Sequence, residues 1–370
     1  MKIVVMGSWA DSLVNFRGPL LAELVRRGHE VTGCAPEPAD DIAERLREIG
    51  AGYEQVKLQR TGMNPLSDAR SIAGIKALLT RLKPDLLLGY TIKPVIYGSM
   101  AAKKAGIDSI FSIITGLGYA FQGETFAQRL TNIGVRRLYR KSLRTNRAVF
   151  FQNPDDMKLF VETEMVKPEQ AVLINGSGVD LDHFNYTEPI VEPFSFLLIA
   201  RLLREKGIKE YAGAARILRE DYPDVKFRLL GPFDRNPSAI DKKTIDEWQD
   251  AGIIDYMGET EDVRPAIAAA SVYVLPSYRE GTPRSVLEAM SMGRPIISTD
   301  VPGCRETVVD GDNGFLVQAR DSLSLAAAMK RFMDDPRIIA GMGQRSRELA
   351  VNKYDVHKVN AAILETMGVV

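Results

Sequence analysis

The feature that most constrains the fold is a repeated alternation of short apolar runs with helix-like stretches. Each run is rich in Val, Ile, Leu and Phe and is closed by turn residues, as is typical of strands buried in a parallel sheet. In the first half, we expect a helix from about Gly18 to Arg27 and strands at KIVVMGS (2–8), HEVTGCA (29–35), DLLLGY (85–90), SIFSII (109–114), AVFFQN (148–153) and AVLING (171–176). In the second half, we expect a helix ending near LREDYP (218–223) and strands at FSFLLIAR (194–201), KFRLLGP (226–232), IDYMG (254–258), VYVLPS (272–277) and PIISTD (295–300). The fold class is therefore α/β, with two Rossmann-like doubly wound domains facing a cleft.

The length of the chain sets the number of domains. A chain of 370 residues is too long for one ordinary core, so two domains are expected. The segment 180–194 is rich in turn formers and prolines and is the expected linker. We predict an N-terminal domain over residues 1–185 and a C-terminal domain over 186–350. The final segment, 351–370, is predicted to return to the first domain as a helix.

Several classes of protein are poorly supported by the composition. The net charge is zero and no nucleic-acid motif is present, so we expect no nucleic-acid partner. Two cysteines make neither a disulfide framework nor a metal set, and the N-terminus lacks the layout of a signal peptide. No apolar run is long enough to span a bilayer. A cytoplasmic protein is expected. With three histidines and no acidic pair at a strand end, we expect no metal and no cofactor.

The stretch REGTPRSVLEAMSMGRP (279–295) holds the most informative pair of acids, Glu280 and Glu288. Thr282 is a good N-cap, Pro283 suits the first helical position, and Gly293 closes the far end, so a helix is predicted between the two glutamates. Glu280 then lies in the loop after a strand, where open α/β sheets bind ligands. The helix N-terminus beside it is a ready anion site, and Gly281 allows close approach. A carboxylate there suits hydroxyl groups, so the ligand is predicted to carry both phosphate and sugar.

Two cations follow the first strand of the second half. Arg201 comes directly after that strand, and Lys206 stands five residues later, before a helix. A guanidinium fork and a point charge together suit a diphosphate. Gly231 and Gly258 close two further strands, at turns where a base could contact the backbone.

The loops of the first half give weaker signals. The loop after strand one is not G-x-G-x-x-G, so a dinucleotide oxidoreductase is poorly supported. The segments 91–99 and 115–124 are expected to be loops that follow later strands and face the cleft. They supply the candidate acceptor-side residues Lys93, Tyr97, Thr115, Gly116 and Gly118.

Basic charge is concentrated between residues 81 and 150, which carry a net charge of +9. Arg136, Arg140, Arg144 and Arg147 follow helical spacing and are expected to share one face. This basic segment can be interpreted either as a solvated helix surface or as a surface that faces anionic lipid. We expect peripheral association with the inner face of a membrane.

The glutamate pair, the ARLLREKG segment (200–207) and the INGSGVD segment (174–180) resemble the retaining glycosyltransferases of family 4. The resemblance implies the GT-B fold, with a nucleotide sugar bound by the C-terminal domain. YTIKPVIYGSMAAKKAGI (90–107) and FSIITGLGYAF (111–121) further resemble bacterial transferases that extend undecaprenyl-diphosphate-linked sugars, including N-acetylgalactosaminyltransferases. The implied partners are a UDP-sugar donor, with GalNAc the best guess, and a lipid-linked saccharide acceptor. Many members of the family carry a histidine in the acceptor loop, whereas the corresponding TGLGYAF has none.

The resemblance also implies roles for single residues. Glu288 would bind the ribose hydroxyls, and Glu280 the hydroxyls of the transferred sugar. Arg201 and Lys206 would hold the diphosphate. Backbone amides around Thr282 to Ser285 would complete the cradle. The donor-binding residues of this stretch are Gly281, Thr282, Pro283, Arg284 and Ser285. Gly18 would let the first domain's helix approach the same phosphates.

Alternative functions remain open at this stage. A UDP-sugar epimerase can use a similar fold but needs acid and base groups at the sugar, and histidine is scarce here. A silent sugar-nucleotide binding module, an interaction protein using the basic helix, and a transferase with a soluble acceptor are the others.

Overall fold

The computed structural model describes residues 1–59, 64–117, 126–234 and 236–369. The chain divides into two compact units. The first unit contains Met1–Ser177 together with His357–Val370, and the second contains Gly178–Val356. The sequence placed the corresponding boundaries at residues 185 and 350. In the structure, the chain passes between the units at Ser177–Gly178 and again at Val356–His357.

The first unit is built on a seven-stranded sheet in the order β3-β2-β1-β4-β5-β6-β7, and its neighbouring strands pair in parallel. Its strands are β1 (Lys2–Met6), β2 (Glu30–Ala35), β3 (Gly52–Gln55), β4 (Leu86–Tyr90), β5 (Ser109–Ile114), β6 (Ala148–Phe151) and β7 (Ala171–Leu173). Its helices are α1 (Asp11–Asn15), α2 (Gly18–Arg26), α3 (Asp40–Glu48), α4 (Pro65–Leu82), the π-helix η1 (Pro94–Gly98), α5 (Ser99–Lys104), α6 (Phe126–Leu143), α7 (Pro154–Glu162) and the short η3 (Pro168–Gln170). Strand β3 was not predicted, because this edge strand is half-exposed and carries no apolar run.

The second unit has a six-stranded sheet in the order β10-β9-β8-β11-β12-β13, again parallel. Its strands are β8 (Ser195–Ile199), β9 (Lys226–Leu230), β10 (Asp255–Tyr256), β11 (Val272–Leu275), β12 (Ile296–Thr299) and β13 (Gly314–Val317). Its helices are η4 (Arg204–Lys206), α8 (Ile208–Leu218), α9 (Lys242–Asp250), α10 (Arg264–Ala268), α11 (Arg284–Ser291), η5 (Arg305–Thr307), α12 (Ser322–Asp334), α13 (Ile338–Leu349) and the π-helix η6 (Ala350–Tyr354). Strand β13 was missed, since a turn-rich segment precedes a short run. The prediction of two Rossmann-like α/β domains is confirmed.

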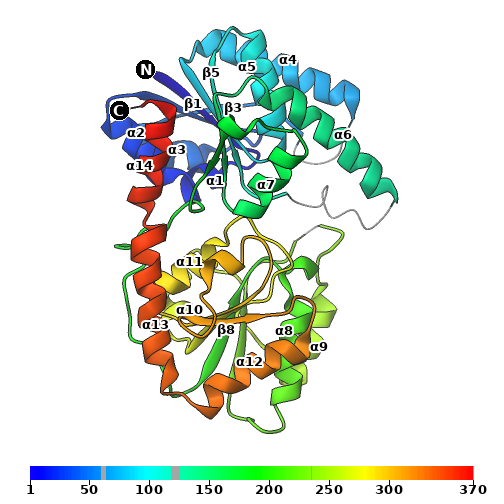
Figure 1. Cartoon of the computed structure of the whole chain (residues 1–370), viewed down its shortest axis with the longest axis vertical. Helices are drawn as coiled ribbons and strands as arrows, with labels where there is room; N and C mark the ends of the chain where they lie inside the picture. Colours follow the sequence, from blue (N-terminus) through cyan, green and yellow to red (C-terminus); the bar gives the residue numbers. More distant parts are fainter. Residues whose placement is uncertain (60–63, 118–125, 235, 370) are drawn as a thin grey trace. The chain divides into compact units, whose positions relative to one another are not determined.

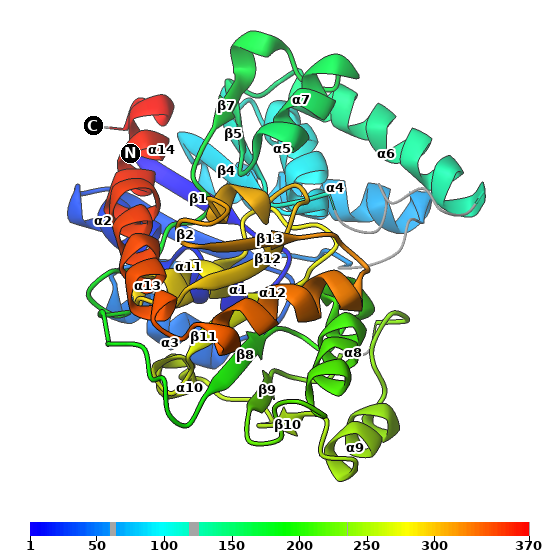
Figure 2. The same cartoon turned by 60° about the horizontal axis from the view of Figure 1, so that its bottom comes forward.

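Each sheet is covered on both faces by helices that bury apolar side chains. In the second unit, α8 and α12 pack together against one face of the sheet (Figure 2). In the first unit, the last helix, α14 (Val356–Met367), lies beside α2 (Figure 1). Its residues Val359, Ile363 and Leu364 join the core that contains Leu21 of α2 and Val5 of β1. The final segment of the chain therefore stabilises the first unit.

Three local predictions need correction. Residues 94–98, expected in a loop, form η1, and the helix continues into α5 because this segment is buried and starts with a proline at its first turn. Helix α6 ends at Leu143, so Arg144 and Arg147 lie beyond it rather than on one face with Arg136 and Arg140. Residues 144–147 connect the end of α6 to the start of β6 at Ala148.

The third correction concerns helix α11. It starts at Arg284, with Pro283 rather than Thr282 as the N-cap. Gly293 has a φ of 81° and closes the helix as expected.

The packing of α14 gives a test of stability. Leu364 is fully buried in the core of the first unit, so Leu364→Ala should lower the free energy of unfolding of this unit by about 2–5 kcal/mol. Urea titration followed by far-UV circular dichroism measures the change. Leu66→Ala is the control, because Leu66 is largely exposed and its truncation should change stability by less than about 0.5 kcal/mol. Equal effects of the two variants would contradict the packing of α14.

Candidate functional site

The second sheet reverses its strand order between β8 and β11. In an open parallel sheet, ligands bind outside the carboxyl ends of the two strands at such a reversal. Arg201 and Lys206 follow β8 along the chain, and Ser277 and Glu280 follow β11. The sequence-predicted donor residues are therefore gathered at the topological switch point of this unit.

Lys206 and Glu280 form an ion pair. Lys206 Nζ lies 2.5 Å from Glu280 Oε1, and both side chains are largely buried. Ser277 Oγ donates to the same carboxylate oxygen over 2.7 Å. Gly207, which follows Lys206, has a φ of 71°, and a Cβ there would lie 2.0 Å from the Pro276 carbonyl oxygen. The absence of that Cβ lets the two loops approach closely enough for the pair to form.

Glu288 lies inside α11 and is only 8% exposed. Arg284, one turn earlier, donates from Nε to Glu288 Oε1 over 2.7 Å. Burial raises the pKa of the Glu288 carboxyl above its ordinary value, and Arg284 offsets part of that rise. Each glutamate of the Glu280–Glu288 motif thus has its own cation, and the two carboxylates differ in their surroundings.

Arg201 is bonded differently from Lys206. Its Nη1 lies 2.7 Å from Asp234 Oδ2, and its side chain is about half exposed. Asp234 was not predicted, because its partner Arg201 stands 33 residues earlier in the chain. The two predicted phosphate cations therefore lie at the same switch point, each paired with its own carboxylate.

Glycines let backbone segments approach one another around Arg201. At Gly231, φ is 147° and a Cβ would lie 2.0 Å from the Ala200 carbonyl oxygen. Gly231 N donates to the Gly258 carbonyl over 2.7 Å, and Gly258 has a φ of 77°. The two predicted strand-end glycines are thus bonded to each other at the end of β9.

The loop after β12 supports the Glu280 loop from the other side. Glu280 N donates to the Pro302 carbonyl over 3.0 Å. A Cβ on Gly303 would lie 2.2 Å from the Glu280 carbonyl oxygen and 2.6 Å from that of Gly281. Sequence reasoning missed Gly303, Pro302 and Ser277. The turn signal of VPG and the serine directly after the β11 run mark these positions.

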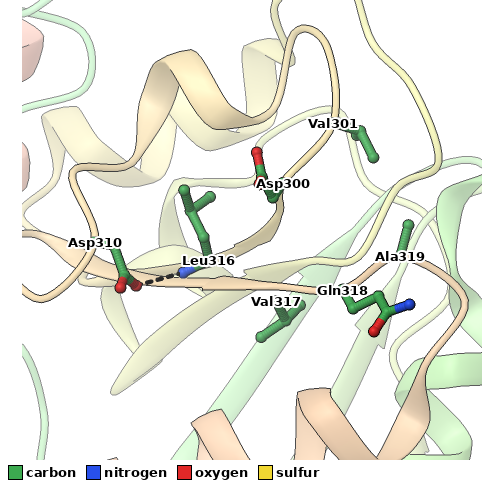
Figure 3. Close-up of a pocket in the computed structure, with 7 residues that line it drawn as sticks. All are labelled: Asp300, Val301, Asp310, Leu316, Val317, Gln318 and Ala319. Atoms are coloured by element: carbon green, nitrogen blue, oxygen red, sulfur yellow. Dashed lines mark hydrogen bonds between the residues drawn. The ribbon is translucent and has the colours of Figure 1, made fainter.

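Among the described residues, a pocket of about 670 Å³ lies along β12 and β13 (Figure 3). None of the predicted donor residues lines it; its lining residues are Asp300, Val301, Asp310, Leu316, Val317, Gln318 and Ala319. Asp310 Oδ1 accepts a hydrogen bond from Leu316 N over 2.9 Å. Asp300 pairs with Arg305 at 2.8 Å. The pocket shares the loop after β12 with the Glu280 site.

The first unit has its own switch point, between β1 and β4. Thr91, just after β4, has a φ of 66° and donates from its hydroxyl to Ser8 Oγ over 2.9 Å. A β-branched residue in this conformation is strained, at a cost of about 1–3 kcal/mol. The hydrogen bond between Thr91 and Ser8 joins the loop after β4 to the loop after β1.

Lys93 and Tyr97, both predicted on the acceptor side, lie near this point. Lys93 Nζ is 3.4 Å from Asp68 Oδ1 of α4 and lies over the ring of Tyr97. Burial first, and then the hydrogen-bonded Asp68, raise the pKa of Tyr97 above its ordinary value. Asp68 was missed, because an acid in the first turn of a helix is common.

The other predicted residues of the first unit are less closely grouped. Gly18 begins α2, and a Cβ there would meet open space. Thr115 and Gly116 follow β5. Gly118 lies outside the described residues.

The four predicted membrane arginines differ in their contacts. Arg140 donates to the carbonyls of Thr163 and Glu164, at the end of α7, and Arg147 donates to the Asp108 carbonyl. Arg136 is half-buried, and Arg144 is exposed. In the described part of the chain, every helix is too short or too polar to cross a membrane.

The described residues contain no group of three or more His, Cys, Asp or Glu that could hold a metal ion. Independence from metal therefore stays a prediction for activity measurements.

Two family models match the chain. Residues 17–176 match the glycosyl transferase 4-like domain, and residues 193–335 match the glycosyl transferases group 1. Together the matches span most of both units.

Among curated proteins, the chain is 26% identical to an N,N'-diacetylbacillosaminyl-diphospho-undecaprenol α-1,3-N-acetylgalactosaminyltransferase of Campylobacter jejuni, over 96% of this chain and 95% of that protein. It is also 26% identical to a UDP-Gal:α-D-GlcNAc-diphosphoundecaprenol α-1,3-galactosyltransferase of Escherichia coli, over 79% of this chain and 77% of that protein.

Solved structures share the fold. A crystal structure of HepE from Anabaena in complex with UDP and glucose superposes with a TM-score of 0.79 at 18% identity, covering all of both chains. Sucrose-phosphate synthase from Thermosynechococcus elongatus gives a TM-score of 0.82 at 19% identity, covering 99% of this chain and 98% of that chain.

The raised pKa of Glu288 predicts a pH-dependent stability. Well below the ordinary Glu pKa of 4.5, the Glu288 carboxyl is protonated in both the folded and the unfolded state. As pH rises, the unfolded state loses its proton first, so folding is progressively disfavoured until pH exceeds the higher folded-state pKa. Glu288→Gln should therefore raise the free energy of unfolding of the second unit at pH 7 and make no difference near pH 4. Urea titrations at both pH values measure this, and a loss of stability at pH 7 would contradict it.

Proposed function

The chain belongs to the glycosyltransferases with a 4-like domain and a group 1 domain on the GT-B fold, and from this we propose that it moves a sugar from a UDP-sugar to an undecaprenyl-diphosphate-linked saccharide in bacterial glycan biosynthesis. The observation that carries the proposal is the Lys206–Glu280 ion pair at the β8/β11 switch point, with Arg201 after the same strand. It supplies a cation for a leaving phosphate and a carboxylate for sugar hydroxyls in one place.

The chemistry asked of such a site is departure of UDP from the anomeric carbon. Negative charge builds on the leaving phosphate, and fixed cations stabilise it without reorganising during the reaction. Lys206 is held ready by Glu280 and needs only to exchange or share that partner when a diphosphate arrives. Arg201, half exposed beside Asp234, is the second cation within this proposal.

We further propose that transfer retains the anomeric configuration. The support is the family resemblance, since no carboxylate among the described residues has been assigned the nucleophile's role that a retaining glycosidase uses. The leaving phosphate oxygen would take the proton from the acceptor hydroxyl. Proton NMR of the product reports the configuration directly.

For the substrates, both relatives support a lipid-linked acceptor, and the Campylobacter relative supports GalNAc as the donor sugar. The Campylobacter relative is named for GalNAc transfer, and the Escherichia coli relative for galactose transfer, to undecaprenyl-diphosphate-linked sugars. A donor-by-acceptor assay with UDP-GalNAc, UDP-GlcNAc and UDP-Gal tests the assignment.

We also propose peripheral contact with anionic lipid through Arg136 and Arg144. Arg140 and Arg147 contribute less, because they already bond to carbonyl oxygens of the protein. Sedimentation with anionic vesicles at low and high salt tests this contact.

The competing function is epimerisation of a UDP-sugar on the same fold. Incubation with radiolabelled donor separates the two functions. Label that moves to the lipid-linked acceptor supports the transferase, and label that stays on UDP in a new sugar supports the epimerase.

The phosphate cations give a prediction for turnover. Lys206→Ala and Arg201→Ala should each lower kcat by about 10²–10³-fold, since each removes stabilisation of leaving-group charge. Lys242→Ala is the control, because it breaks an exposed ion pair with Asp246 elsewhere in the second unit. Initial rates with saturating substrates measure the effect. Near-normal rates for both site variants would reject their assignment.

The two glutamates give a prediction for binding. Glu288→Gln should weaken binding of UDP and of UDP-sugar alike, because the ribose is common to both. Glu280→Gln should weaken binding of the intact donor only, or lower kcat. Isothermal titration calorimetry with each ligand measures the difference. Equal losses of UDP affinity in the two variants would show that the division of roles is wrong.

A further inference from the structure

The helix at the end of the second unit is bonded to the loop that supports Glu280. This helix runs through α13 into the π-helix η6, whose last residue, Tyr354, is 1% exposed. Tyr354 donates from its hydroxyl to the Glu306 carbonyl over 2.5 Å, and Lys353 Nζ donates to the same oxygen over 3.0 Å. Glu306 lies in η5, within the loop after β12. Two side chains of η6 therefore converge on one backbone carbonyl of that loop.

The same loop holds the backbone of Glu280. Hydrogen bonds within residues 301–307 close them into a compact turn. The Pro302 carbonyl in this turn accepts the bond from Glu280 N, and Gly303 leaves no room for a Cβ beside the Glu280 carbonyl oxygen. A shift of the Glu306 carbonyl is therefore passed through the turn to the backbone of Glu280.

A second set of buried polar side chains anchors the loop to α13. Asn313 and Ser346 are almost completely buried. Asn313 Nδ2 donates to the Thr307 carbonyl over 3.1 Å, and its Oδ1 accepts from Val309 N over 2.7 Å. Ser346 Oγ, on α13, donates to the Asn313 carbonyl over 3.2 Å. The helix thus holds the loop at Ser346 and again at η6.

Tyr354 is also bonded to the point where the chain first enters the second unit. Its carbonyl accepts from Val179 N over 2.8 Å, and Val356 N donates to the Val179 carbonyl over 3.0 Å. A Cβ on Gly178 would lie 2.6 Å from Val356 Cα, so this close approach requires a glycine, whose φ is 72°. Through its backbone Tyr354 joins the two crossing segments of the chain, and through its side chain it joins them to the Glu280 loop.

Polar contacts at this place give a geometry that apolar packing would not. Hydrogen bonds are directional, whereas hydrophobic contact is not. Burial lowers the pKa of Lys353, whose Nζ lies 4.9 Å from the centre of the Tyr354 ring, so an ammonium held here lowers stability. An apolar side chain would cover the ring without that cost. The arrangement therefore favours one fixed position of the loop over maximum stability.

We infer that Tyr354, supported by Lys353, is a positioning residue of the donor site, which holds the loop after β12 so that Glu280 meets the transferred sugar. The inference rests on the proposed function for the role of Glu280. Both side chains act through the Glu306 carbonyl rather than by touching a substrate. Their loss should therefore affect the sugar part of the donor and spare its UDP part.

A double-mutant cycle tests the inference. UDP-GalNAc, UDP-GlcNAc and UDP-Gal are titrated into the wild type by isothermal titration calorimetry, and the one that binds most tightly serves as the probe donor. Tyr354→Phe removes the hydroxyl and keeps the ring, so affinity for the probe donor should fall about 5–10-fold, as for one lost hydrogen bond. In a Glu280→Ala background the same change should cost less than about two-fold, because the side chain that Tyr354 places is already gone. Affinity for UDP should not change on Tyr354→Phe.

A matched tyrosine separates positioning from stability. Tyr211 is fully buried in the same unit, and its hydroxyl donates to the Phe196 and Arg228 carbonyls at 3.0 and 3.1 Å. Tyr211→Phe and Tyr354→Phe should each lower the unfolding midpoint by about 2–4 °C. Only Tyr354→Phe should weaken binding of the probe donor relative to UDP. A residue with a structural role alone would behave as Tyr211 does.

Lys353 supplies an independent variant. Lys353→Met removes the second donor to the Glu306 carbonyl, so affinity for the probe donor should fall about 5-fold. Lys330→Met is its control, because Lys330 Nζ lies 4.8 Å from the centre of the Tyr222 ring elsewhere in the second unit. This control should bind the probe donor as the wild type does.

The outcomes distinguish this inference from the proposed function. If the wild type transfers sugar to a lipid-linked acceptor but Tyr354→Phe and Lys353→Met keep normal donor affinity, the positioning role is wrong and the transferase stands. Equal losses for UDP and the probe donor, or equal effects of Tyr354→Phe with and without Glu280, overturn it in the same way. If the cycle shows the expected coupling but no sugar is transferred, the positioning role stands and the transferase fails. If the wild type binds none of the donors, the inference fails together with the role of Glu280.

Discussion

Parallel pairing of the strands is the constraint on which both candidate sites depend. When strands run in parallel, their carboxyl ends meet at one edge, and a reversal of strand order opens a crevice there. Both sheets have one such reversal, between β1 and β4 and between β8 and β11. The polar side chains of interest are grouped at these two points. Loops from distant parts of the sequence are brought together by the sheet rather than by contacts of their own.

Close approach of those loops depends on glycine. Gly207 and Gly231 each face a carbonyl oxygen at a distance that would leave no room for a Cβ. Any side chain at either position would push apart the strand ends that carry Lys206 and Arg201. The ion pair between Lys206 and Glu280 then fixes the positions of these two side chains, because a buried charge needs a partner.

The sequence predicted candidate site residues where the neighbouring residues carry a clear strand or helix signal. Glu280, Glu288, Arg201 and Lys206 were predicted as site residues because each follows a recognisable strand or lies in a helix with clear end signals. Asp234 and Asp68 were not found, because their partners stand 33 and 25 residues away and only the tertiary structure brings them together. Ser277 bonds to Glu280 only 3 residues later, and it was overlooked although it follows the β11 run. The prediction that one helical face extends from Arg136 to Arg147 was wrong for a related reason. Helical spacing alone extended the predicted basic face to Arg147. In the structure, α6 ends at Leu143 and the chain enters β6 at Ala148.

The two sites also share an energetic character that separates them from the surrounding core. Burial raises the folded-state pKa of the Glu288 carboxyl, so ionisation of this group lowers the stability of the fold. Thr91 holds a backbone conformation that glycine would hold at lower energy. Neither feature stabilises the apolar core, and both lower the stability of the free protein. Residues that destabilise the free chain at both switch points are therefore better evidence of binding than the pocket along β13, whose lining shows no comparable cost.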